Sequence, residues 1–243
     1  MNVLAHCRVY PLSTFYKPTA LHIEWLRKDR FGNLVDKPHD EADENHVGLV
    51  GFLHLIEHGF QMTEFKSSVV RRLIDGLPNQ TFVLVIDIAS CWHKFATEYS
   101  HEEKSVAYMN SASLLHFESL INFLAQLNEN PQEALSRCKQ AAPLQFQLAS
   151  IVIDNISYYT HDNASYELLF KVLRMLRSRY GCSIMTVGFG LDFYNGVEQS
   201  FATNKTYDVP TRLPMTYVKN MDCVLQRDNA STARVVYTKN SMP

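Results

Sequence analysis

The sequence predicts an α/β fold: a mostly parallel central sheet flanked by helices, with a C-terminal antiparallel hairpin. Three observations predict it. Short apolar runs alternate with segments of helical periodicity over residues 47–243. Two of these runs are continuously apolar and end on an aspartate, as strands of a parallel sheet covered on both faces do. The last two runs are separated by a short polar turn, which is the pattern of a hairpin.

The elements in the first half of this region follow from their apolar pattern. Val50–Ile56 is largely apolar and predicts a strand. Thr63–Asp75 predicts a helix because its apolar residues gather on one side. Phe82–Ile86, which ends at Asp87, predicts a buried strand, and Ser105–Met109 predicts a further short one.

Helices dominate the next stretch. Ser113–Leu127 carries apolar residues at helical spacing, and Pro131–Arg137 starts a second helix with proline in its first position. The strand Ser150–Ile153 follows. Tyr166–Tyr180 predicts a long helix because one face is apolar, and Gly181 is a residue type that ends helices well.

The C-terminal part contains a strand, a long connection and the hairpin. Ser183–Val187 predicts the strand. Asn195–Leu213 is a polar connection with basic and aromatic residues, a composition that suits contact with single-stranded nucleic acid. Met221–Gln226 and Ala233–Thr238 form the expected hairpin.

The N-terminal part differs in composition. Asp36–His46 is acidic and poor in apolar residues, which predicts a linker, and residues 1–35 are too few for a domain of their own. We therefore expect an N-terminal segment with its acidic linker, residues 1–46, packed on a core domain, residues 47–243. Tyr10, Phe15 and Tyr16 are candidates for contact with a partner, although packing within the chain explains them equally well.

Composition excludes several classes of protein. With 243 residues, 46% of them hydrophobic and 20% charged, the chain is globular rather than disordered. Its net charge of -2 gives no overall attraction to nucleic acid. The 5 cysteines are widely spaced, which favours reduced thiols in the cytosol or nucleus. We expect no membrane span and no signal peptide, because no long apolar stretch is present.

Residues 60–67 match a phosphate-loop pattern in which both glycines are replaced. The pattern requires glycine, four residues, then glycine, lysine and serine or threonine. Lys66 and Ser67 are in register, whereas Phe60 and Phe65 occupy the glycine positions. Glycine lets backbone N–H groups close on phosphate oxygens, so we expect two phenyl rings to fill the cradle and Glu64 to repel phosphate. The segment is thus a vestigial phosphate site, or simply an ordinary start of a helix.

Asp154 occupies the position where nucleotide-hydrolysing folds carry a magnesium-coordinating aspartate after an apolar strand. Most such aspartates only cap a buried strand where solvent begins. Without a phosphate cradle a metal has nothing to bridge, so we interpret Asp154 as a vestigial metal site and expect no bound metal.

Three other patterns favour structural explanations. His54 and His58 match a zinc-protease motif, but the nearby glycines disfavour the helix that this motif needs. Cys91 and His93 lack an orienting carboxylate, so we expect a buried thiol and a surface imidazole. A basic stripe on the 166–180 helix predicts a solvated face, with a phosphate or acidic partner as the alternative; its members are Lys171, Arg174, Arg177 and Arg179.

The order of these parts resembles the RecA-type recombinase core. The chain is further similar to the platinum-sensitivity subunit family of the Shu complex, a family of recombinase paralogues. The segments that carry this likeness are Arg8–Ser13, Gly51–His54, Tyr108–Ser111, Ile151–Asn155 and Asp192–Gly196.

The resemblance implies a nuclear, non-catalytic subunit with no cofactor and no ATP hydrolysis. It implies a heterodimer with a second RecA-like Shu subunit, joined by two further Shu subunits. It also implies binding to single-stranded or forked DNA and assistance to a strand-exchange recombinase and its paralogues in error-free recombination repair.

The family's DNA contacts lie on the loop that follows Asn195–Gly196. Carry-over places them on Lys205 and, with weaker alignment, on Arg212 and Lys219. The loop is shorter in this chain than in its family relative and lacks a dense basic cluster. We therefore expect this subunit to bind DNA more weakly than that relative does. Two alternatives remain open: a nucleotide-dependent α/β hydrolase with a divergent phosphate site, and a scaffold that does not touch DNA.

Overall fold

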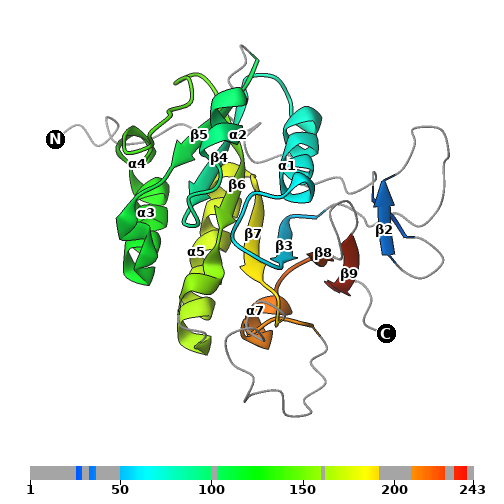
Figure 1. Cartoon of the computed structure of the whole chain (residues 1–243). Helices are drawn as coiled ribbons and strands as arrows, with labels where there is room; N and C mark the ends of the chain where they lie inside the picture. Colours follow the sequence, from blue (N-terminus) through cyan, green and yellow to red (C-terminus); the bar gives the residue numbers. More distant parts are fainter. Residues whose placement is uncertain are drawn as a thin grey trace.

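The structure, a computed structural model, describes residues 26–28, 33–36, 50–99, 103–159, 162–191, 209–227 and 233–239. Within them, helices cover both faces of a central sheet, so the predicted α/β class is confirmed (Figure 1). The elements in chain order are β1 (Leu26–Lys28), β2 (Asn33–Asp36), β3 (Phe52–Glu57), α1 (Glu64–Gly76), β4 (Thr81–Asp87), α2 (His93–Glu98), β5 (Lys104–Met109), η3 (Ala112–Leu115), α3 (Phe117–Glu129), α4 (Pro131–Ser136), β6 (Gln147–Asp154), η4 (Ile156–Tyr158), α5 (Asn163–Tyr180), β7 (Ser183–Phe189), α7 (Met215–Val218), β8 (Cys223–Arg227) and β9 (Ala233–Thr238).

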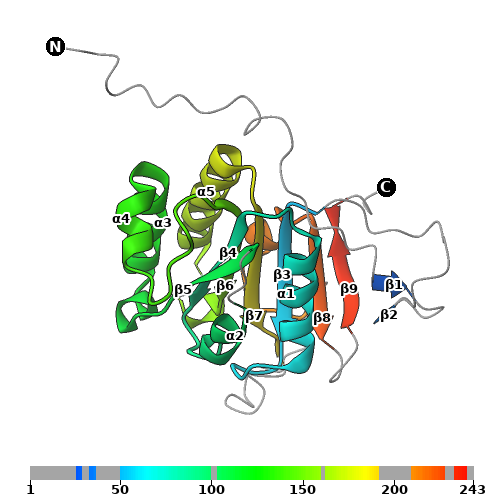
Figure 2. The ribbon, with the colours of Figure 1, turned by 90° about the horizontal axis from the view of Figure 1, so that it is seen from above.

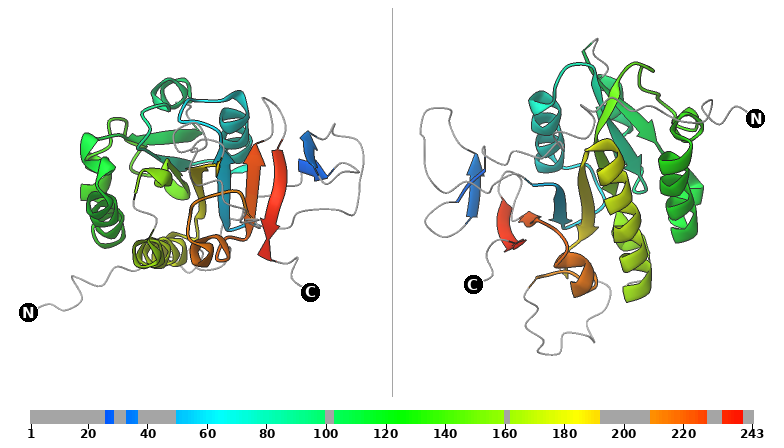
Figure 3. Two further views of the ribbon diagram at one scale, coloured as in Figure 1. Left: turned by 60° about the horizontal axis from the view of Figure 1, so that its bottom comes forward. Right: turned by 180° about the vertical axis from the view of Figure 1, so that it is seen from behind.

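The strands form one sheet of order β1-β2-β9-β8-β3-β7-β6-β4-β5. Every pairing from β8 to β5 is parallel, whereas β9 pairs antiparallel with β8 and with β2. The expected C-terminal hairpin is therefore present. The two views of Figure 3 show β1 and β2 beyond β9 at one edge; the remainder of residues 1–46, including Tyr10, Phe15 and Tyr16, lies outside the described residues.

Alternation along the strands divides the core into two layers. On β3, Phe52 and Ile56 face the layer beneath α3, α4, α5 and α7, whereas Leu53 and Leu55 face the layer beneath α1 and α2. Figure 2 shows these helices on opposite sides of the sheet. Successive side chains of a strand point to opposite faces, so apolar residues at every position of a central strand are buried on both sides.

Local capping explains where the helices depart from expectation. α5 begins at Asn163, earlier than predicted, because the Asp162 carboxylate accepts the Ser165 amide at 2.8 Å. It ends as predicted at Gly181, whose φ of 64° is left-handed. The helix predicted from Ser113 is instead the short η3 followed by α3, because His116 between them has extended backbone.

Candidate functional site

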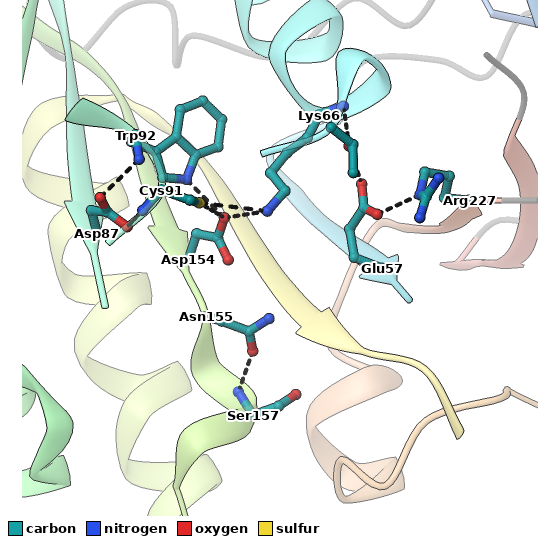
Figure 4. Close-up of polar contacts among 10 residues, drawn as sticks. Glu57, Lys66, Asp87, Cys91, Trp92, Asp154, Asn155, Ser157 and Arg227 are labelled. Carbon is teal, nitrogen blue, oxygen red and sulfur yellow. Dashed lines mark hydrogen bonds and ion pairs between the residues drawn. The ribbon is translucent and has the colours of Figure 1, made fainter. Parts of the chain in front are cut away.

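Residues 60–67, which the sequence analysis interprets as a vestigial phosphate loop, run from the connection after β3 into the start of α1. Lys66 is in the first turn of α1, and Asp154 is the last residue of β6. The structure brings them together: Lys66 Nζ lies 2.7 Å from Asp154 Oδ2, and both side chains are fully buried (Figure 4). In a functional phosphate loop this lysine would contact phosphate oxygens. Here it forms an ion pair with Asp154 of the same chain.

Trp92 completes the enclosure of this pair. Its indole Nε1 donates to Asp154 Oδ2 at 2.7 Å, and its ring lies 5.9 Å from the Lys66 ammonium. Trp92 is itself fully buried. Burial is the largest effect and lowers the pKa of Lys66, but the combined effects of Asp154, Cys91 and Glu57 outweigh it and raise the pKa above the ordinary value. The lysine therefore stays protonated, and its charge is balanced by a neighbouring carboxylate.

A second buried carboxylate, Glu57, occupies the end of β3 beneath the loop. Its Oε2 lies 2.5 Å from Arg227 Nε at the end of β8, and its Oε1 accepts the Thr63 hydroxyl at 2.9 Å. The Thr63 hydroxyl oxygen in turn accepts the Lys66 amide at 3.1 Å. The start of α1 is thereby capped by groups of the chain itself, and the Glu57 carboxylate that holds Thr63 is balanced by Arg227.

The loop backbone also lacks the left-handed conformation that glycine would provide. Among the described residues, positive φ angles occur at Gln80, Ser90 and Gly181, and none of these lies between β3 and α1. The peptide N–H groups of residues 58–63 therefore do not adopt a glycine-dependent cradle.

The two phenylalanines do not act together as expected. Phe60 is 48% exposed, so its ring does not plug a closed cradle. Phe65 is buried in the apolar layer under α1. The site is closed instead by Trp92 and the Lys66–Asp154 pair. No sequence pattern singles out Trp92, although this residue lies between Cys91 and His93, which were considered as a possible nucleophile and base.

The structure describes two of the three predicted DNA-binding residues, and these two lie apart. Lys205 lies outside the described residues. Arg212 follows the base of a loop whose two ends are held together, because Leu191 N donates to Pro210 O at 3.0 Å and Gly190 bridges to Thr211. This base continues from the carboxyl end of β7, beside Glu57 of β3.

Lys219 lies at the other end of the sheet. It directly follows α7, and nearby Asp222 accepts the amides of Gly51 and Phe52 at the amino end of β3. Asp222, three residues after Lys219, therefore lies at the opposite end of β3 from the loop base. The structure brings Arg212, but not Lys219, to the base of this loop.

His54 and His58 do not stand on the helix that the zinc-protease motif needs. His54 is on strand β3 rather than on a helix, and its Nδ1 lies 2.9 Å from Thr186 Oγ1. Complete burial lowers the pKa of His54 to about 3. Within the described part of the chain, no group of three or more histidine, cysteine, aspartate or glutamate residues is arranged to hold a metal ion.

Two further patterns resolve into structural roles. Burial raises the pKa of the Cys91 thiol well above its ordinary value, which disfavours a nucleophile, whereas His93 is exposed. The basic stripe of α5 is divided: Lys171 and Arg174 face solvent, but Arg177 turns inward and donates to Cys182 O at 2.9 Å.

Comparisons with known proteins identify the family. A family model described as "Shu complex component Psy3, DNA-binding description" matches residues 7–230. The chain is 34% identical over 245 residues to "Platinum sensitivity protein 3" of Saccharomyces cerevisiae (strain ATCC 204508 / S288c), covering 94% of this chain and 93% of that protein.

Two solved structures show distant likeness. The EssC ATPases 2 and 3 from Geobacillus thermodenitrificans give a TM-score of 0.37 with 14% identity over 78% of this chain and 32% of theirs. The cytoplasmic domain of EssC gives 0.35 with 12% identity over 74% of this chain and 32% of its own. No helix in the described ranges is both long and apolar enough to cross a membrane. On the family match and the curated relative, the chain belongs to the family of the DNA-binding Shu complex component Psy3.

Proposed function

We propose that this chain is a non-catalytic recombinase paralogue that binds DNA without using ATP. The observation that carries the proposal is the Lys66–Asp154 pair, since the residue that would grip a nucleotide is buried at 2.7 Å from an internal carboxylate. A triphosphate that used Lys66 would have to break that pair. The family's DNA-binding description supports the DNA half of the proposal.

DNA contact is assigned to the loop whose base is formed by Gly190–Leu191 and Pro210–Thr211. Lys205 within it and Arg212 at its base provide the phosphate contacts. Lys219 has the weakest role, because it lies near the opposite end of β3. With a net charge of -2, the chain relies on a partner for part of the electrostatic attraction.

The partners follow from the family. The chain pairs with a second RecA-like Shu subunit, and this heterodimer joins two further Shu subunits in the nucleus. The assembly binds single-stranded or forked DNA and promotes filament formation by the strand-exchange recombinase and its paralogues in error-free repair. The residues 1–46, with Tyr10, Phe15 and Tyr16, are candidates for the contact between subunits.

Two measurements on the purified heterodimer test this function. Fluorescence anisotropy with forked DNA at two salt concentrations should show binding that weakens with salt. Radiolabelled ATP should not bind saturably, with or without magnesium. Saturable ATP binding would overturn the ATP-independent function, and absence of DNA binding at low salt would overturn the DNA-binding role.

One observation favours the alternative of a nucleotide-dependent hydrolase. The buried Asp154 Oδ1 has no hydrogen-bond partner among the described residues, so this carboxylate retains capacity for a further ligand. The hydrolase alternative predicts magnesium-dependent ATP turnover by the wild-type heterodimer. The proposed function predicts no turnover.

A further inference from the structure

Tyr158 is an exposed aromatic residue at the carboxyl edge of the sheet. It is the last residue of η4, which follows the end of β6, and 43% of it is exposed. Its ring lies edge-to-face on Phe189, with centroids 5.7 Å apart and planes at 72°. An exposed aromatic ring that is held in place by its neighbours is a candidate for stacking contact with a flat ligand.

The turn that carries Tyr158 is fixed on both sides. The Ser157 amide donates to Asn155 Oδ1 at 2.8 Å, and the Phe189 amide donates to the Ser157 hydroxyl at 2.8 Å. Figure 4 shows the contact between Asn155 and Ser157. The Tyr166 hydroxyl also donates to Ile156 O at 2.7 Å. A ring on such a fixed turn loses little conformational freedom on binding, which favours affinity.

Hydrogen bonding on the far side of the turn tethers it to η3. The next residue, Tyr159, is buried, and its hydroxyl donates to Leu114 O at 2.6 Å. Of these two adjacent tyrosines, Tyr159 is therefore buried and hydrogen-bonded, whereas Tyr158 faces solvent.

The exposed ring also lies near the base of the loop assigned to DNA. Phe189, on which the ring of Tyr158 rests, is the last residue of β7 and directly precedes Gly190. Gly190 pairs with Thr211 at the base of that loop, and Arg212 is the next residue. Tyr158 is therefore an aromatic surface next to a place where backbone phosphates would be held.

We propose that Tyr158 is a stacking platform for a base of single-stranded DNA. The inference rests on the proposed DNA-binding function and adds a contact to the bases, whereas Arg212 contacts the phosphates. Every base has an aromatic face, so such a contact adds affinity with little sequence preference. Stacking of one base corresponds to about 5- to 150-fold in Kd.

The test uses the heterodimer and fluorescence anisotropy with oligothymidylate. Tyr158→Ala should weaken binding at least about 5-fold, and the slope of log Kd against log salt should not change. Tyr158→Phe should retain most of the affinity, whereas Tyr158→Leu, which keeps an apolar contact on Phe189, should lose it. The exposed Met175→Ala on α5 is the matched control and should bind as wild type.

An oligonucleotide of equal length with abasic sites separates stacking from indirect effects. Wild type and Tyr158→Ala should bind the abasic strand equally, because no base is present to stack. An equal loss on both strands, or a Tyr158→Leu variant that binds like wild type, would overturn the stacking role. If wild type binds oligothymidylate and Tyr158→Ala binds within twofold of it, this inference fails alone; if wild type does not bind, the proposed function fails first.

Discussion

Replacing one member of the buried Lys66–Asp154 pair should destabilise the fold severely. Lys66→Met removes the ammonium 2.7 Å from Asp154 Oδ2 and leaves a carboxylate buried without its counter-charge. Breaking such a pair costs about 3–5 kcal/mol. This is a large share of the roughly 5–15 kcal/mol that holds a typical domain folded.

The double variant Lys66→Met with Asp154→Asn should recover most of that loss. Both charges are then absent, and the asparagine side-chain oxygen still accepts from Trp92 Nε1. We expect a free energy of unfolding within about 1–2 kcal/mol of wild type, because well-packed neutral replacements of a buried ion pair are often tolerated. The single losses would then be far from additive, as they are for residues in direct contact.

Equilibrium urea unfolding followed by circular dichroism measures these differences. Lys94→Met is the control, because Lys94 is paired with Glu98 at 3.9 Å on the surface with 90% of its side chain exposed, and it should change stability by less than about 0.5 kcal/mol. A loss of less than about 1 kcal/mol for Lys66→Met would show that its ammonium is solvated. The closed-site interpretation would then be abandoned.

Three further outcomes are expected. The pKa of His54 is about 3 in the folded protein and 6.5 ordinarily, so protonation favours the unfolded chain. The free energy of unfolding should therefore be highest above pH 6.5 and fall by up to about 1.4 kcal/mol per pH unit below it. The variant His54→Gln should flatten this slope in urea titrations at several pH values. Thr63→Ala removes the cap of α1 and should cost about 1–2 kcal/mol in thermal or urea unfolding, whereas an unchanged midpoint would contradict the capping role. Lys205→Ala combined with Arg212→Ala should weaken DNA binding by roughly 1–2 kcal/mol in anisotropy titrations, with Lys219→Ala near wild type; equal loss from Lys219→Ala would contradict the placement derived from the fold.

Periodic apolar patterns predicted most of the fold, because they reflect burial that is repeated along an element. The strand ending at Asp154 and the helix ending before Gly181 followed from such patterns. The short α2 and α7 were missed, since each has only one turn or slightly more and too few residues to show a period.

The site was predicted only in part, for a related reason. Lys66 and Asp154 were located because a spaced motif marks them. Trp92 and the Glu57–Arg227 pair carry no such mark, and Glu57 and Arg227 are 170 positions apart in the chain. Contacts of that kind come from the order of strands in the sheet, which local sequence does not specify. The exposure of Phe60 similarly depends on the path of the loop rather than on residue type.

The internal neutralisation of Lys66 has a consequence for timing. On the proposed ATP-independent function, no nucleotide hydrolysis would end the contact of this subunit with DNA. Its residence on DNA would then be set by dissociation alone, and the cellular ratio of ATP to ADP would leave that residence unchanged.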